Sequence, residues 1–123
     1  MATFKRFEEI QAWQKARVAT RLIYQATADG LCAKNYGLRD QMRRATVSIM
    51  ANIAEGYGKR SNKEFANFLN MAHGSAAEVQ SHLYVALDLN YMNQTMFNEL
   101  YEVFDEISRM IMALAKHLRA STT

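Results

Sequence analysis

The chain of 123 residues lacks proline altogether, and it contains only five glycines and one cysteine. With no proline, and with most glycines close to expected helix ends, the composition predicts an all-α fold. The single cysteine, Cys32, excludes an internal disulfide, is typical of a reducing cytoplasm and lies in no nucleophile motif. No run of about 18 apolar residues exists, so we expect no membrane span. The N-terminus also lacks the apolar core of a secretion signal.

Charge is unevenly distributed along the chain. Fifteen basic and 12 acidic side chains give a net charge of +3. Residues 1–64 carry twelve basic and six acidic side chains, whereas residues 65–123 carry three and six. The basic surplus therefore belongs to the first half, which fits a polyanionic partner and fits ordinary solubility equally well.

Apolar residues recur at helical spacing in four segments, which predict four helices. We expect these helices over residues 9–28, 38–56, 61–90 and 93–119. Ser61 and Glu64 form an S-x-x-E capping box before the third helix, and Asn93 is the expected cap of the fourth. Short connections make consecutive helices antiparallel neighbours, so we predict one domain, residues 1–123, folded as an up-down-up-down four-helix bundle. The longest connection, "ADGLCAKNY", is expected to be a loop.

The predicted helices carry more apolar side chains than one bundle core needs. The additional apolar positions are Val18, Leu22, Met50, Ala54, Tyr57, Tyr84, Tyr91, Tyr101 and Met112. Extra apolar stripes on a small bundle favour self-association, so we expect a homo-oligomer. The alternative is that these side chains lie at the edge of the core, with the tyrosine hydroxyls reaching water.

The stretch "EGYGKRSNKEF" contains the glycine and lysine of a phosphate-binding loop. Such a loop requires G-x-x-x-x-G-K followed by Ser or Thr, between a strand and a helix. Here Ile53 replaces the first glycine, Arg60 follows Lys59, and the preceding segment is helical, so we reject a nucleotide site. We expect a turn in which Gly56 closes the helix in the left-handed conformation and Gly58 permits the reversal. The basic residues then lie on an exposed turn beside a helix N-terminus, where an anion can bind.

Polar residues interrupt the second and third predicted helices at positions that are expected to face the core. They are Arg44, Ser48, Asn52, Glu55, Ser75 and Glu78. Because buried polar groups must be paired, we expect Arg44 to pair with Glu55 or Glu78. Asn52 is expected to bind backbone or Ser75, and we interpret the set as a structural network that fixes helix register. The alternative is a small enzyme that uses Glu55 and Glu78, although no nucleophile or base accompanies them.

A metal centre does not fit the pattern of histidines and carboxylates. A carboxylate-bridged di-iron site in a bundle requires two Glu-x-x-His pairs and two further carboxylates. Glu78 and His82 are four residues apart, and Asn70 stands where His73 would need a carboxylate. We therefore expect no metal, no cofactor and no catalytic residues.

Three stretches together resemble the ribosomal-RNA intervening-sequence family of four-helix-bundle proteins. They are "FEEIQAWQKA", "YGLRDQMRRATVSIMANIAEGYGKRSNKEFANFLNMAHGSAAEVQSHL" and "ALDLNYM", within about residues 7–118. Members are encoded within insertions in large-subunit ribosomal RNA genes, or elsewhere in bacterial genomes. The family is similar to the accessory variability determinant of diversity-generating retroelements, a basic pentamer that works with a reverse transcriptase and nucleic acid. The resemblance therefore implies a homopentamer of up-down bundles and a nucleic-acid partner, and it implies no established reaction.

The favoured function is that of a non-enzymatic, homo-oligomeric cytoplasmic protein that binds RNA or DNA and no membrane. The predicted phosphate contacts are Arg39, Arg43, Lys59, Arg60, Lys63, Lys15, Arg17 and Arg21. We expect them to neutralise phosphates and not to read bases, because no aromatic platform is interleaved with them. For each residue the alternative is an ordinary solvated charge. The alternative function is a protein-binding scaffold or accessory subunit, for example of a reverse transcriptase, without nucleic-acid contact.

Overall fold

The computed structural model describes residues 4–121, which are helical apart from short connections. A 3-10 turn, η1 (Phe7–Glu9), precedes five α-helices. These are α1 (Gln11–Ala26), α2 (Gly30–Lys34), α3 (Tyr36–Tyr57), α4 (Asn62–Asp88) and α5 (Gln94–Ala120). The all-α prediction is confirmed, and the four predicted helices correspond to α1, α3, α4 and α5.

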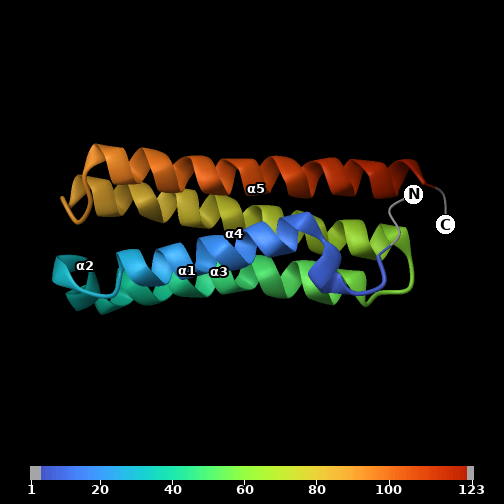
Figure 1. The fold of residues 1–123 in the computed structure, drawn as a ribbon, viewed down its shortest axis with the longest axis horizontal. Coiled ribbons are helices and arrows are strands. Elements are labelled where there is room, and N and C mark those ends of the chain that lie inside the picture. Colours follow the sequence, from blue (N-terminus) through green and yellow to red (C-terminus); the bar gives the residue numbers. More distant parts are fainter. Residues whose placement is uncertain (1–3, 122–123) are drawn as a thin grey trace.

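The four long helices lie side by side along the longest axis of the molecule (Figure 1). The chain reverses direction at each end, so consecutive long helices run in opposite directions (Figure 1). α1 packs on α3 and α5, and α4 packs on the same two helices from the other side. In the view of Figure 1, α4 and α5 form the upper layer of the molecule, and α1 and α3 form the lower one. Within residues 4–121, no helix is long and apolar enough to cross a membrane.

Side-chain caps begin α4 and α5 where the sequence indicates them. Ser61 Oγ accepts a hydrogen bond from the Glu64 backbone N–H at 3.1 Å, and Asn93 Oδ1 accepts one from Met96 at 2.8 Å. Each cap satisfies one of the backbone donors that a helix leaves free at its N-terminus. Both predicted caps are confirmed.

The connection between α1 and α3 contains a short helix, α2, so the prediction of a loop over this stretch is wrong. Gly30 adopts a φ of +72° at its start, a left-handed conformation that glycine accepts readily. Cys32 is only 3% exposed, and this burial raises the pKa of its thiol. Asn35 ends α2 and caps α3, because its Oδ1 accepts the Leu38 N–H at 3.2 Å. Burial against the rest of the fold stabilises a helix that is too short to form alone.

The core runs along the inside of the four long helices. Its largest fully buried side chains include Phe104, Ile10, Ile23, Met42, Ile49, Ile53, Leu69, Leu83, Ile107 and Ile111. Several alanines are also fully buried, among them Ala19 on α1 and Ala72 and Ala76 on α4. These small side chains allow the helix backbones to approach closely.

Gly56 has a different role from the one that the sequence predicts. It lies inside α3, which continues to Tyr57, and its φ is not in the left-handed region. A Cβ added at Gly56 would lie 2.7 Å from the Cβ of Phe68 on α4. Gly58, the C-cap residue, adopts an ordinary right-handed φ of −75°. The left-handed closure at Gly56 is therefore wrong, and the residue instead permits close packing of α3 on α4.

Some of the additional apolar side chains make contacts within the chain. The Tyr57 hydroxyl donates to the Phe4 carbonyl at 2.6 Å, and the Tyr91 hydroxyl accepts from Asn35 Nδ2 at 3.2 Å. Others remain on the surface: Val18, Tyr84 and Met112 are 43%, 50% and 39% exposed. The first group lies at the edge of the core, and the second leaves apolar surface available for contact with another molecule.

Candidate nucleic-acid interface

Basic side chains predominate in one layer of the fold and acidic side chains in the other. α1 carries three basic side chains and no acidic one, and α3 carries three basic and two acidic. α4 and α5 together carry four basic and seven acidic side chains. Because α1 and α3 pack side by side, the basic surplus of the first half of the sequence becomes the surplus of one layer.

The exposed side of the basic layer has two hollows along α1. The first, of about 380 Å³, is lined by Trp13, Gln14, Arg17, Val18 and Arg21. The second, of about 440 Å³, is lined by Tyr24, Asp40, Arg43, Arg44 and Val47. Residues 17, 21 and 24 are spaced by four and three, so they lie on one side of α1. We call Arg17, Arg21, Tyr24, Arg43 and Arg44 the α1–α3 basic face.

The guanidinium of Arg43 contacts several groups at the end of α1. Its Nε donates to Thr27 Oγ1 at 2.9 Å, and its Nη2 donates to the carbonyls of Thr27 at 3.3 Å and Tyr24 at 3.4 Å. Its guanidinium carbon lies 4.5 Å from the centroid of the Tyr24 ring. The two carbonyls belong to the C-terminal end of α1, where a cation satisfies free acceptors and the negative end of the helix dipole. Arg43 therefore joins α3 to α1, whatever else it contacts.

Arg39 is also held by neighbouring groups. Its Nε donates to Asp40 Oδ1 at 3.0 Å, and its Nη1 donates to the Ala33 carbonyl at 3.2 Å. Its guanidinium carbon lies 4.8 Å from the centroid of the Tyr36 ring. Arg39 thus links α2 to the start of α3.

The cations with the most freedom are on the exposed sides of α1 and α3. Arg17, Arg21 and Arg44 are exposed, and none forms an ion pair with another residue of the described part of the chain. Lys15 differs, because its Nζ lies 3.1 Å from Glu106 Oε2 on α5. Arg44, which the sequence assigns to a buried network, is therefore a better candidate for a phosphate contact than Lys15.

The predicted contacts Lys59, Arg60 and Lys63 lie beyond the other end of α3. All three are exposed, and Lys59 Nζ lies 5.1 Å from the centroid of the Phe68 ring. α3 has 22 residues, which corresponds to a length of about 33 Å. Arg39 and Arg43 lie near its start, so the structure separates the predicted contacts into a face and a distant turn.

The predicted polar network is brought together only in part. Ser48 Oγ lies 2.9 Å from Ser75 Oγ, and Asn52 Nδ2 donates to the Ser48 carbonyl at 2.9 Å and to its Oγ at 3.1 Å. These half-buried groups link α3 to α4. The remaining members are exposed: Arg44, Glu55 and Glu78. The expected ion pairs of Arg44 are not found among residues 4–121, because the strip lies beside the core and not within it.

The described surface carboxylates and histidines do not form a cluster that could hold a metal ion. Glu78 Oε2 lies 3.4 Å from His82 Nε2 one turn along α4. In the part of the chain that the structure describes, no group of three or more His, Cys, Asp or Glu side chains is placed to hold a metal ion. Every buried side-chain nitrogen or oxygen there has a hydrogen-bond partner. No unpaired buried group therefore marks a ligand site in this region.

Sequence reasoning missed the aromatic rings beside the cations. Tyr36 and Arg39 are three residues apart, a spacing that the sequence displays. Tyr24 and Arg43 meet only because α1 packs on α3. The expectation that no aromatic side chain is interleaved with the basic residues is wrong.

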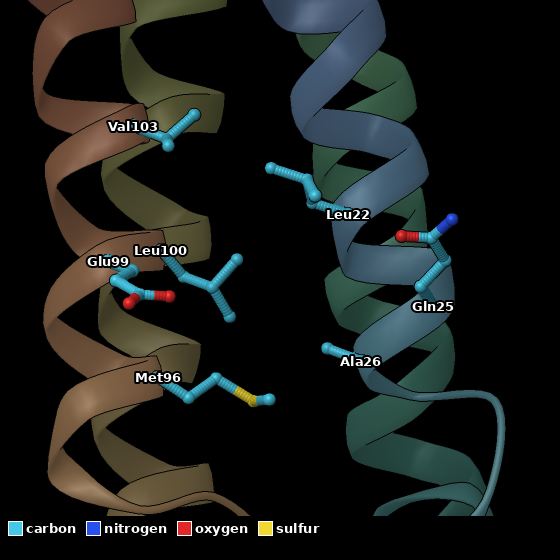
Figure 2. Close-up of a pocket in the computed structure, with 7 residues that line it drawn as sticks. All are labelled: Leu22, Gln25, Ala26, Met96, Glu99, Leu100 and Val103. Carbon is cyan, nitrogen blue, oxygen red and sulfur yellow. The ribbon is translucent and has the colours of Figure 1, made fainter.

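A third hollow, of about 420 Å³, lies between α1 and α5 (Figure 2). It is lined by Leu22, Gln25, Ala26, Met96, Glu99, Leu100 and Val103. Figure 2 shows the side chains of Met96, Leu100 and Val103 reaching toward α1 across an open space. Most of the lining is apolar, so this groove suits contact with protein more than with phosphate.

These features define an all-α protein with four long helices, a basic layer and an acidic layer. The model of the family described as 23S rRNA-intervening sequence protein matches residues 8–113. The chain therefore belongs to the 23S rRNA-intervening sequence protein family, which confirms the resemblance seen in the sequence. A crystal structure of a protein of unknown function from the S23 ribosomal protein family of Bacteroides thetaiotaomicron has the same fold, with a TM-score of 0.78 and 23% identity. The match covers 85% of this chain and 98% of that one, and the comparison with curated proteins found no match.

Proposed function

We propose that this protein is a non-enzymatic, homo-oligomeric nucleic-acid-binding protein, with RNA as the favoured ligand. The observation that carries the proposal is the α1–α3 basic face, where Arg17, Arg21 and Arg44 are exposed without ion-pair partners among residues 4–121. Exposed clustered arginines bind phosphates through charge-assisted hydrogen bonds and displace the counterions of a polyanion. The family description refers to an intervening sequence of 23S rRNA, so RNA is the first ligand to test.

Assembly is the second part of the proposal. An up-down-up-down bundle that forms a pentamer follows from the resemblance, and two features of this chain support self-association. One is the apolar groove between α1 and α5, and the other is the exposed apolar side chains such as Tyr84 and Met112. A ring would repeat the α1–α3 basic face around an axis, so several copies would engage one polyanion together.

Charge reversal on α1 tests the contact surface. We expect the double substitution Arg17→Glu and Arg21→Glu to weaken binding of a fluorescent RNA in an anisotropy titration. It should also reduce the slope of log affinity against log salt by about 1.4, since each phosphate contact with a single strand contributes about 0.7. The matched control is Lys116→Glu with Arg119→Glu, which changes the net charge equally at the exposed end of α5.

Each outcome of this experiment assigns the contact surface. If the control weakens binding as much as the α1 pair, overall charge governs binding and the α1–α3 basic face is not the site. If only Lys59→Glu with Arg60→Glu reduces the slope, the turn after α3 is the contact. If the unmodified protein binds no RNA or DNA at about 50 mM salt, where phosphate contacts are strong, the proposed function is wrong.

The second candidate function is that of a protein-binding scaffold or accessory subunit, for example of a reverse transcriptase. An aromatic cluster at the surface of α4 and α5 favours it. The Tyr84 ring lies 4.8 Å from that of Phe97 and 5.9 Å from that of Tyr101, and Tyr84 is half exposed. Exposed tyrosine on a rigid helical surface is typical of protein interfaces. This second function becomes the favoured one if no nucleic acid binds.

A further inference from the structure

Two tyrosines stand exposed beside arginines at the junction of α1, α2 and α3. Tyr24 is 41% exposed and Tyr36 is 64% exposed. The guanidinium of Arg43 lies against the first ring and that of Arg39 against the second, at 4.5 and 4.8 Å from the ring centroids. Each ring is thus held by a cation and still offers a large surface to solvent. Such cation–aromatic pairs occur where proteins bind the bases of single-stranded nucleic acid.

The hollow beside Tyr24 has further groups that suit a nucleotide. It is a shallow, open depression of about 440 Å³, and Arg44 lines it without an ion-pair partner in the described residues. Asp40 also lines it, with its side chain 60% exposed and its charge balanced by Arg39 at 3.0 Å. A carboxylate so balanced accepts hydrogen bonds from the N–H groups of bases without strongly repelling phosphate. Val47 supplies apolar contact in the same hollow.

We propose that this hollow receives an unpaired base of single-stranded nucleic acid, which stacks on Tyr24 while Arg21 and Arg44 contact the adjacent phosphates. The proposal rests on the proposed function and specifies its ligand. In a duplex the base faces are covered by neighbouring base pairs, so only an unstacked base presents a face to the tyrosine. Arg17 and Arg21, one turn apart on α1, extend the cationic path along which the backbone of the strand runs.

An abasic strand separates stacking from phosphate binding, because it has the phosphates and lacks the bases. We would measure binding of the full chain to fluorescent oligouridine of about 15 nucleotides, and to an abasic strand of the same length. We expect the oligouridine to bind about five- to a hundred-fold more tightly. Tyr24→Leu should remove this advantage and leave binding of the abasic strand unchanged, whereas Tyr24→Phe should keep it.

The failures of the two proposals are distinguishable. Equal binding of oligouridine and the abasic strand would overturn the stacking proposal and leave the proposed function standing. Equal weakening of both strands by Tyr24→Leu would also overturn it, since the loss would then arise from displacement of Arg43 and its neighbours. Binding of neither strand would overturn the stacking proposal, and the proposed function would be overturned with it only if duplex RNA and DNA also fail to bind at about 50 mM salt.

Discussion

Arg43 and Arg44 are adjacent in the sequence, and the structure gives them opposite roles. Arg43 donates three hydrogen bonds to the last turn of α1 and stacks on Tyr24, whereas Arg44 is exposed and forms no ion pair among residues 4–121. We predict that Arg43→Met destabilises the fold and that Arg44→Met does not. The two variants remove the same charge from the same turn of α3, so each serves as the control for the other.

The magnitude follows from the groups that Arg43 contacts. A cation at a helix C-terminus contributes about 0.3–1 kcal/mol at the surface and about 2 kcal/mol when partly buried. The stacked pair adds about 0.5–1 kcal/mol. Thr27, which is fully buried, keeps its hydrogen bond to the Ile23 carbonyl at 2.8 Å, so its hydroxyl is not left without a partner. Because the arginine is half-buried, water replaces part of what is lost, and we expect a total of about 2–3 kcal/mol for Arg43→Met.

Urea unfolding followed by circular dichroism measures the difference between the two variants. Arg44→Met should change the free energy of unfolding by less than about 0.5 kcal/mol, as exposed substitutions usually do. For a chain of this size Arg43→Met should lower the Tm by roughly 6–15 °C. Equal free energies of unfolding for the two variants would refute the assignment of Arg43 as the link between α1 and α3.

Two further predictions concern helix packing and assembly. Gly56→Ala should destabilise the fold by about 1–3 kcal/mol in the same assay, since its Cβ would meet Phe68 Cβ at 2.7 Å. Gly74→Ala is the control: Gly74 lies inside α4, and nothing lies within 4 Å of the new Cβ. This substitution should stabilise the fold by about 0.5–1 kcal/mol. Equal effects of the two substitutions would contradict the close approach of α3 and α4. Light scattering at micromolar concentration should give a mass of about five chains, as the resemblance implies, and a clean monomer of 14.1 kDa would exclude the proposed assembly.

The sequence by itself determined the features that depend on residues within a few turns of one another. Apolar periodicity located all four long helices, because a helix face needs an apolar residue about every third or fourth position. Ser61 and Asn93 were identifiable as caps, because the cap and the N–H that it accepts are three residues apart. The family resemblance could likewise be recognised from the sequence, since it rests on the order of residues and not on their arrangement in space.

Only the tertiary structure decided which polar and small residues meet across the helices. Arg43 and Arg44 differ by about 100° in direction around α3, and nothing in the chain states that this helix turns the first toward α1 and the second toward solvent. The rotations of α3 and α4 about their own axes place Glu55 and Glu78 outside the core, and the close packing of α3 on α4 gives Gly56 its role. Tyr24 becomes part of the candidate site because Arg43, 19 residues away, reaches its ring. Such pairings depend on helix rotation and separation, which are set by the packing of the whole core.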